Sequence, residues 1–174
     1  EAEVPAGVAW VNLGTLRYDL VQFHFHTLSE HTLDGRRFPI EQHFVHRGPN
    51  GETLVIGLFL ISGESDDDED EGGSVQDQVL RRIPAECGEE TLIRGADLRS
   101  ALPRSPATFR YQGSLTASPN NEGVSWLVVD RPKPIAGSSI TSFQRVFPGG
   151  NARDLQPLNG RVVAFRPQLG QDLL

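Results

Sequence analysis

The chain has 174 residues, a length typical of one domain, and its 37% hydrophobic and 22% charged residues exclude both a disordered chain and a membrane protein. Its net charge of −7 comes from 16 basic and 23 acidic residues, which excludes the basic surface of a nucleic-acid-binding protein. The single cysteine, Cys87, excludes a disulfide within the chain.

Glycine and proline recur at short intervals along the chain, and β-branched or aromatic runs lie between them. This pattern predicts a mostly β protein. The predicted strands, in chain order, are Leu16–Thr27, Phe38–Arg47, Thr53–Ile61, Thr108–Gln112, Val124–Val129 and Arg161–Phe165.

Three short segments are predicted to be helices because each stops at or just before a proline: Ser74–Arg82, Ala96–Leu102 and Ser139–Phe147. Ser139 is the expected N-cap of the last one. Seven acidic residues between Glu64 and Glu71 lack the glycine turn and final glutamate of a calcium loop, so we expect a solvated surface loop there.

All five histidines fall within 23 positions of the sequence, at His24, His26, His31, His43 and His46. Alternate residues of a strand share a face, so His24 and His26 point one way while Phe23 and Phe25 point the other. His43 of the next strand joins them if the two strands are neighbours. Three imidazoles on one face are the ligand set of a catalytic zinc site, which leaves a fourth position open to water.

Strand parity keeps His46 out of this cluster, and His31 lies beyond the end of the first strand. We therefore interpret both as structural histidines. Gln22 and Glu41 share the face of the cluster. Metal-bound histidines need a second hydrogen-bond partner that fixes their tautomer, and these two residues can supply it.

The histidine segments resemble the core of the α-class carbonic anhydrases. The resemblance rests on Gln22-Phe23-His24-Phe25-His26, on Ser29-Glu30-His31 and on Glu41-Gln42-His43-Phe44-Val45-His46, with further matches at Tyr111–Thr116, Glu122–Trp126 and Asn151–Arg161. It runs from about Val4 to Arg161. It implies one domain over residues 1–174, built around a large twisted, mainly antiparallel sheet with short peripheral helices.

The resemblance implies a role for each matching residue. His24, His26 and His43 are expected to bind Zn²⁺, and Gln22, Glu41 and the carbonyl of Asn151 to accept hydrogen bonds from them. Thr116 is expected to accept a hydrogen bond from zinc-bound hydroxide and to donate one to Glu30. An apolar wall for CO2 is expected from Val45, Val55, Leu115, Val124 and Trp126.

The implied reaction is the reversible hydration of CO2 to bicarbonate and a proton. Zinc lowers the pKa of bound water from 15.7 to about 7, and the resulting hydroxide attacks CO2. Inhibition by sulfonamides is also expected from the family. Bacterial relatives are usually periplasmic or secreted, so we expect the same location, although the chain begins without the basic and apolar segments of a signal peptide.

The sequence departs from the family pattern in two places. The N-terminal segment of the family, with its Gln-Ser-Pro-Ile motif and proton-shuttle histidine, does not occur in these residues. We therefore expect protons to leave through water and external buffer. The uncovered wall of the cleft is expected to favour a homodimer or an open cleft. The family's Thr-Thr-Pro-Pro-Cys becomes Thr116-Ala117-Ser118-Pro119-Asn120, which removes one hydroxyl near the bicarbonate site.

Two other interpretations stay open. One is a carbonic-anhydrase-like protein that has lost catalysis and binds a partner or a metal. The other is a cupin-like iron or manganese site, since His24-x-His26-x-x-x-Glu30 fits the first half of that motif. The second half of the cupin motif is not found, because Pro49-Asn50-Gly51 has no histidine after it.

Overall fold

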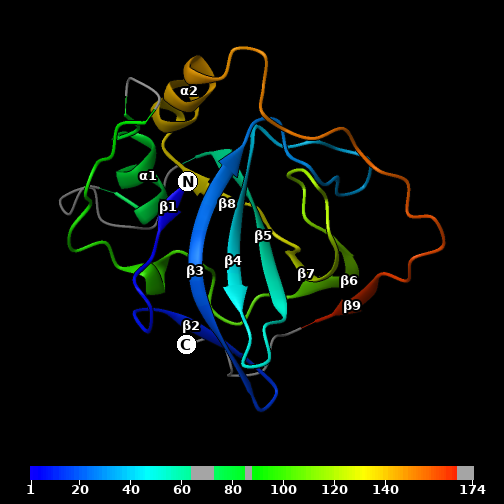
Figure 1. The fold of residues 1–174 in the computed structure, drawn as a ribbon. Helices are drawn as coiled ribbons and strands as arrows, with labels where there is room; N and C mark the ends of the chain where they lie inside the picture. Colours follow the sequence, from blue (N-terminus) through cyan, green and yellow to red (C-terminus); the bar gives the residue numbers. More distant parts are fainter. Residues whose placement is uncertain (64–72, 85–87, 168–174) are drawn as a thin grey trace.

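The structure is a computed structural model, and it describes residues 1–63, 73–84 and 88–167. The acidic run Glu64–Glu71 and Cys87, which the sequence singled out, lie outside the described residues. The described residues form a nine-stranded mixed sheet with two short α-helices (Figure 1). The strands are β1 (Ala2–Glu3), β2 (Trp10–Leu13), β3 (Leu16–His26), β4 (Ile40–Arg47), β5 (Thr53–Ser62), β6 (Thr108–Ser114), β7 (Glu122–Val129), β8 (Lys133–Ile135) and β9 (Ala164–Arg166).

The strands follow the order β1-β3-β4-β5-β7-β6-β9, with β2 paired to β3 and β8 paired to β5. All pairs are antiparallel except β5 with β7 and β5 with β8, which are parallel. The predicted mostly β fold with a large, mainly antiparallel sheet is confirmed. Because β3 and β4 are direct neighbours, the two histidine-bearing strands lie side by side in the middle of Figure 1.

The main hydrophobic core lies on one face of the sheet, and α1 (Val75–Leu80) and α2 (Gly137–Val146) contribute to it. Alternation along β3 sends Phe23 and Phe25 into this core. Phe44 of β4 joins them, with its ring centroid 5.8 Å from that of Phe23. The opposite face of the same strands is therefore free to carry polar side chains.

The two helices are joined through Asp77, whose side chain is buried at the start of α1. Its carboxylate accepts hydrogen bonds from the hydroxyls of Ser74 (2.8 Å) and Ser139 (2.5 Å) and from the backbone N–H of Ala136 (3.1 Å). Ser74 is the N-cap of α1 and accepts from the Asp77 N–H. The contact fixes α2 against α1 on the core side of the sheet.

Several sequence predictions need correction. Helix α2 begins at Gly137 after Ala136, so Ser139 is not its N-cap; the Ser139 hydroxyl is used by Asp77 instead. The helix predicted at Ala96–Leu102 is only a 3₁₀ turn over Leu98–Ser100, capped by Asp97. The last strand covers Ala164–Arg166 rather than Arg161–Phe165.

Three short strands were not predicted: β1, β2 and β8. Each has two to four residues, too few for an alternating pattern to emerge. They pair with long strands at the margins of the sheet, so their strand geometry comes from the partner. Within the described ranges, no helix combines the length and the apolar character that crossing a membrane requires.

Candidate metal centre

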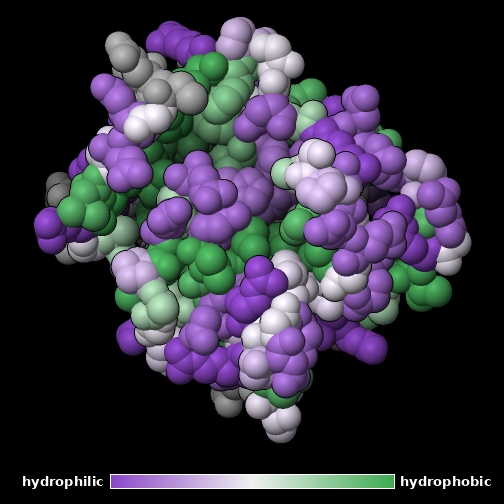
Figure 2. Space-filling view, in the orientation of Figure 1, coloured by the Kyte–Doolittle hydropathy of each residue, from purple (hydrophilic) through white to green (hydrophobic). Residues whose placement is uncertain are grey.

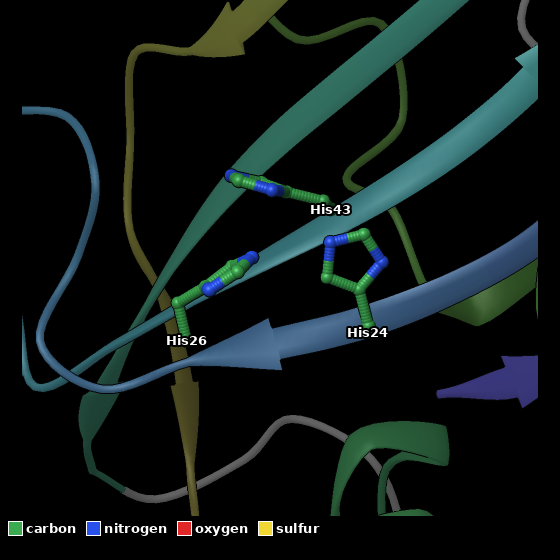
Figure 3. Close-up of side chains that lie close together, drawn as sticks. All are labelled: His24, His26 and His43. Carbon is green, nitrogen blue, oxygen red and sulfur yellow. The ribbon is translucent and has the colours of Figure 1, made fainter. Parts of the chain in front are cut away.

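His24, His26 and His43 converge on the face of the sheet away from the main core (Figure 3). His24 and His43 are direct cross-strand neighbours, because the β3–β4 register pairs them. The ring centroids lie 4.9 Å apart for His24 and His26, 5.3 Å for His24 and His43, and 4.6 Å for His26 and His43. One ring nitrogen from each histidine lies within 4.8 Å of the other two. The structure thus brings together the three residues that the sequence predicted as ligands.

Each ring has a hydrogen-bond partner on its other side. Nδ1 of His24 lies 2.8 Å from the Gln22 side-chain oxygen, and Nε2 of His43 lies 2.9 Å from Oε1 of Glu41. Nδ1 of His26 lies 3.3 Å from the carbonyl oxygen of Asn151. These oxygens accept, so each histidine donates outward and keeps an unprotonated nitrogen for the centre of the cluster.

Asn151 reaches the cluster from a distant part of the sequence because it is fixed to the end of β3. Its side chain accepts from the Thr27 N–H (2.8 Å) and donates to the Phe25 carbonyl (2.9 Å), and its own N–H donates to the Thr27 carbonyl. Gly150 has a φ of 77°, and a Cβ there would lie 2.7 Å from the Thr27 oxygen. Only glycine lets the loop approach β3 this closely.

The surroundings favour neutral imidazoles. Burial, together with the neighbouring rings of His43 and His26, lowers the pKa of His24 to about 3. Burial, followed by the neighbouring His43, also lowers the pKa of His26. Both rings are therefore uncharged at neutral pH, which is the form that binds a metal ion.

This donor set fits a zinc ion. Nε2 of His26 is buried and has no hydrogen-bond partner, which is costly unless something else occupies its lone pair. Three neutral imidazole nitrogens suit Zn²⁺ and leave one position for an exogenous ligand. A second geometric group, His31, Glu41 and His43, does not fit a metal, because the Glu41 oxygens and both His31 ring nitrogens already have hydrogen-bond partners.

Glu30 and Thr116 line the same cavity, which has a volume of about 490 Å³. Oε1 of Glu30 accepts a hydrogen bond from the Arg153 N–H (2.6 Å) and lies 3.3 Å from Nδ1 of His26. Oε2 of Glu30 is buried without a hydrogen-bond partner. Among the described residues no hydrogen bond joins Thr116 to Glu30, so the pairing implied by the family is not formed in this structure. The free Oε2 is the atom that could accept one.

The five residues predicted to form an apolar wall lie in one cluster, separate from the main core. Val55, Val124 and Trp126 are buried, and Val45 and Leu115 pack against them. Trp126 is in contact with His43, at 4.8 Å between ring centroids. In Figure 2 a hydrophilic patch over the upper parts of the central strands borders a hydrophobic band. Through the contact of Trp126 with His43, the apolar cluster adjoins the histidines.

Sequence reasoning missed the functional context of His31 and Tyr111. Nδ1 of His31 lies 2.6 Å from Oε1 of Glu41, and its Nε2 lies 2.6 Å from the Tyr111 hydroxyl. His31 was expected to be structural, yet it shares an oxygen of Glu41 with His43. No periodicity could show this, because His31 lies in a loop and Tyr111 comes from β6. His46, by contrast, is buried on the opposite face and donates to its own strand at the Phe44 carbonyl.

Comparison with known proteins identifies one family. A family model described as eukaryotic-type carbonic anhydrase matches residues 4–167. The carbonic anhydrase of Pectobacterium carotovorum is 35% identical over 147 residues, which cover 84% of this chain and 57% of that protein. The carbonic anhydrase of Neisseria gonorrhoeae is 34% identical over 163 residues, covering 94% of this chain and 62% of that protein. The chain thus spans about three fifths of the length of these relatives.

Solved structures agree with this result. The α-carbonic anhydrase of Thermovibrio ammonificans, solved with the inhibitor sulfanilamide, has a TM-score of 0.78 and 32% identity over 94% of this chain and 80% of that one. The carbonic anhydrase Cah3 of Chlamydomonas reinhardtii, solved with acetazolamide, has a TM-score of 0.82 and 31% identity over 94% of this chain and 71% of that one. These matches decide between the two metal-binding families that the histidine spacing left open, and they exclude the cupin interpretation.

Proposed function

The chain belongs to the eukaryotic-type, or α-class, carbonic anhydrase family, and from this membership we propose that it catalyses the reversible hydration of CO2 to bicarbonate and a proton with Zn²⁺ as its metal. The observation that carries the proposal is the convergence of His24, His26 and His43, each with an outward hydrogen bond and an inward nitrogen. When bound, zinc supplies a Lewis acid that lowers the pKa of water to about 7 and so makes hydroxide available at neutral pH.

The remaining residues of the site orient the three imidazoles and the reacting groups. Gln22, Glu41 and the Asn151 carbonyl hold the three imidazoles in one tautomer and orientation. Glu30 lines the same cavity as Thr116, and its Oε2 is buried without a hydrogen-bond partner. We propose that the Thr116 hydroxyl donates a hydrogen bond to this oxygen during the reaction, which leaves the hydroxyl oxygen to accept a hydrogen bond at the reacting centre.

The substrate matches the apolar cluster beside the histidines. CO2 has no hydrogen-bond donor and a small dipole-free surface, so it partitions into an apolar pocket rather than a polar one. Val45, Val55 and Trp126 offer such a surface next to His43. We propose that CO2 binds against them.

No further histidine among these 174 residues is available to carry the released proton away from the site. Three of the five histidines bind the metal in this proposal; His31 is half-buried and hydrogen-bonded to Glu41 and Tyr111, and His46 is buried and hydrogen-bonded to its own strand. We propose that this chain passes protons to water and external buffer. Its turnover then depends on the buffer concentration.

The test is stopped-flow CO2 hydration by the zinc-loaded chain over a series of buffer concentrations. We expect a rate that disappears on chelation, returns with zinc, rises with buffer and is inhibited by sulfanilamide. A His43→Gln variant is the matched control, since it removes one ligand from the same strand face. Full zinc occupancy with no rate above background would contradict the proposal.

The second candidate is a binding protein with this fold and no hydration activity. Dioscorin, solved in complex with ascorbate, has a TM-score of 0.74 and 27% identity to this chain, covering 92% of this chain and 67% of that one. A protein of this fold can thus hold an organic ligand. Zinc-loaded protein without hydration activity would favour this candidate.

A further inference from the structure

Glu41 is the residue on which the orientation of His43 depends, and it is fully buried. Its Oε2 accepts from the backbone N–H groups of Glu30 (2.9 Å) and His31 (2.8 Å). Its Oε1 is shared between Nδ1 of His31 (2.6 Å) and Nε2 of His43 (2.9 Å). A carboxylate that accepts from four donors cannot rotate freely. Any displacement of Oε1 would therefore change the length and direction of its hydrogen bond with His43.

The charge on Glu41 is maintained by the same contacts. Burial alone would raise its pKa, but His31 and His43 together hold that pKa well below its usual range. The carboxylate therefore only accepts, and both imidazoles must present an N–H to it. This leaves Nδ1 of His43 unprotonated and directed at the other ligand histidines.

Tyr111 supports the far side of this network. Its hydroxyl lies 2.6 Å from Nε2 of His31, and its ring is stacked on Trp126 with an interplanar angle of 7°. Burial raises the pKa of the Tyr111 phenol, so the hydroxyl stays protonated; burial alone would lower the pKa of His31, but the Glu41 carboxylate raises it. In the neutral and in the charged form of His31 alike, Nδ1 can carry a proton toward Glu41 while Nε2 stays hydrogen-bonded to the Tyr111 hydroxyl.

Gly57 of β5 supplies the space in which Oε1 of Glu41 lies. It is the direct cross-strand neighbour of His43. A Cβ on Gly57 would lie 2.8 Å from Oε1 of Glu41, closer than real Cβ atoms come, while its other nearest neighbours, on Val128 and Trp126, would be at ordinary distances of 3.7 and 3.8 Å. Gly57 has no positive φ, so the backbone would accept alanine and Glu41 alone would be displaced.

We propose that Gly57 and Tyr111 are positioning residues for the metal ligand His43: Gly57 leaves room for Oε1 of Glu41, and Tyr111 fixes the His31 ring that holds this oxygen from the other side. Neither residue offers an atom to the metal. This inference rests on the proposed metal site, and it extends the control of that site from β3 and β4 to β5 and β6.

The test compares zinc affinity of Gly57→Ala and Tyr111→Phe with that of the unchanged chain, by competition with a chelator. Loss of a residue that orients a metal ligand typically lowers affinity about 10–100-fold. We expect this loss for Gly57→Ala and a smaller loss for Tyr111→Phe. A changed visible spectrum of the cobalt-loaded variants is expected as well, because it reports the geometry around the ion.

Two control variants match these changes. Gly149→Ala adds a Cβ where no atom lies within 4 Å, and Tyr18→Phe removes the hydroxyl of the chain's other tyrosine. Both are expected to bind zinc as the unchanged chain does. The melting temperatures of the metal-free proteins separate loss of the fold from loss of positioning.

A double-mutant cycle identifies the atom involved. In a Glu41→Ala background there is no carboxylate to displace, so the additional effect of Gly57→Ala on zinc affinity should disappear. If the effect persists there, or if Gly57→Ala and Tyr111→Phe bind zinc like the unchanged chain, the inference is wrong. If the unchanged chain itself binds no zinc, the proposed function fails instead.

Discussion

The two carboxylate oxygens of Glu30 have different surroundings, and this difference allows a test of its role. Oε1 accepts from the Arg153 N–H, whereas Oε2 is buried without a hydrogen-bond partner and lies 3.9 Å from Nδ1 of His43. Glu30→Gln keeps an oxygen for Arg153 but replaces the accepting Oε2 by a donor. We expect zinc to stay bound and CO2 hydration to fall about 100-fold, the usual effect of losing one preorganised hydrogen bond at a reacting centre.

The measurement pairs zinc content with stopped-flow rates. Glu3→Gln is a control, because Glu3 is exposed on β1. Loss of zinc from Glu30→Gln would identify Glu30 as a metal ligand and contradict the prediction.

His46 gives the stability of the chain a dependence on pH. Burial lowers its pKa to about 4, although its hydrogen bonds to the backbone oppose this. The unfolded chain, with a histidine pKa near 6.5, binds a proton that the folded chain does not. The contribution of His46 to the free energy of unfolding is complete above pH 6.5 and is lost as the pH falls toward 4. At pH 5 the loss is about 2 kcal/mol.

Urea unfolding of the unchanged chain and of His46→Gln at several pH values between 7 and 5 measures this effect. The other histidines are common to both proteins and cancel in the comparison. We expect the free energy of unfolding to fall more steeply with acidification in the unchanged chain. Parallel profiles for the two proteins would refute the assignment to His46.

At the scale of elements, the contact between α1 and α2 is expected to depend on Asp77. This buried carboxylate joins the hydroxyls of Ser74 and Ser139 and the N–H of Ala136. Asp77→Ala leaves these donors without their acceptor inside the protein, so we expect a loss of about 2–4 kcal/mol in the free energy of unfolding. Denaturant unfolding measures it.

Asp97→Ala is the matched control for that change, because Asp97 also caps a helical turn but in an exposed position. We expect Asp97→Ala to lower the free energy of unfolding by less than about 1 kcal/mol, as the loss of an exposed cap does. Zinc affinity should be unchanged in both variants, since the helices lie on the core face. Equal stability losses would show that Asp77 acts only as a local cap.

The sequence predicted the elements whose packing is local and missed those that depend on distant partners. The long strands β3, β4 and β5 could be predicted because each has eight or more residues, enough for an alternating pattern or a continuous apolar run to appear. Ser139 has the properties of an N-cap, but the tertiary contact with Asp77 uses its hydroxyl inside α2. The Ala96–Leu102 segment shows only three residues of 3₁₀ turn, since a cap and a following proline are compatible with a turn as well as a helix.

At the scale of the whole molecule, the three histidines could be predicted to converge because parity and neighbouring strands are enough to place them. The hydrogen-bond network behind these histidines could not be predicted from the sequence. Tyr111, His31 and Gly57 come from β6, a loop and β5, and only the order of strands in the sheet brings them to Glu41. Strand order is set by the packing of the whole sheet, and no local pattern encodes it.

The proposed metal centre joins segments that are far apart in the chain, so zinc should stabilise the molecule as a whole. His26 of β3 meets the Asn151 carbonyl, 125 positions later, and His43 meets His24 across the β3–β4 pair. An unfolded chain does not hold these nitrogens together, so we expect zinc to bind the folded state and to raise the free energy of unfolding by about 4 kcal/mol at a free zinc concentration 1,000 times the dissociation constant. For a chain of this size that corresponds to about 8–16 °C in melting temperature. Calorimetry with zinc and with excess chelator measures the shift, and His43→Gln, which lacks one ligand, should lose most of it. A melting temperature that is the same with and without zinc would mean that the three histidines do not form a metal site in the folded chain.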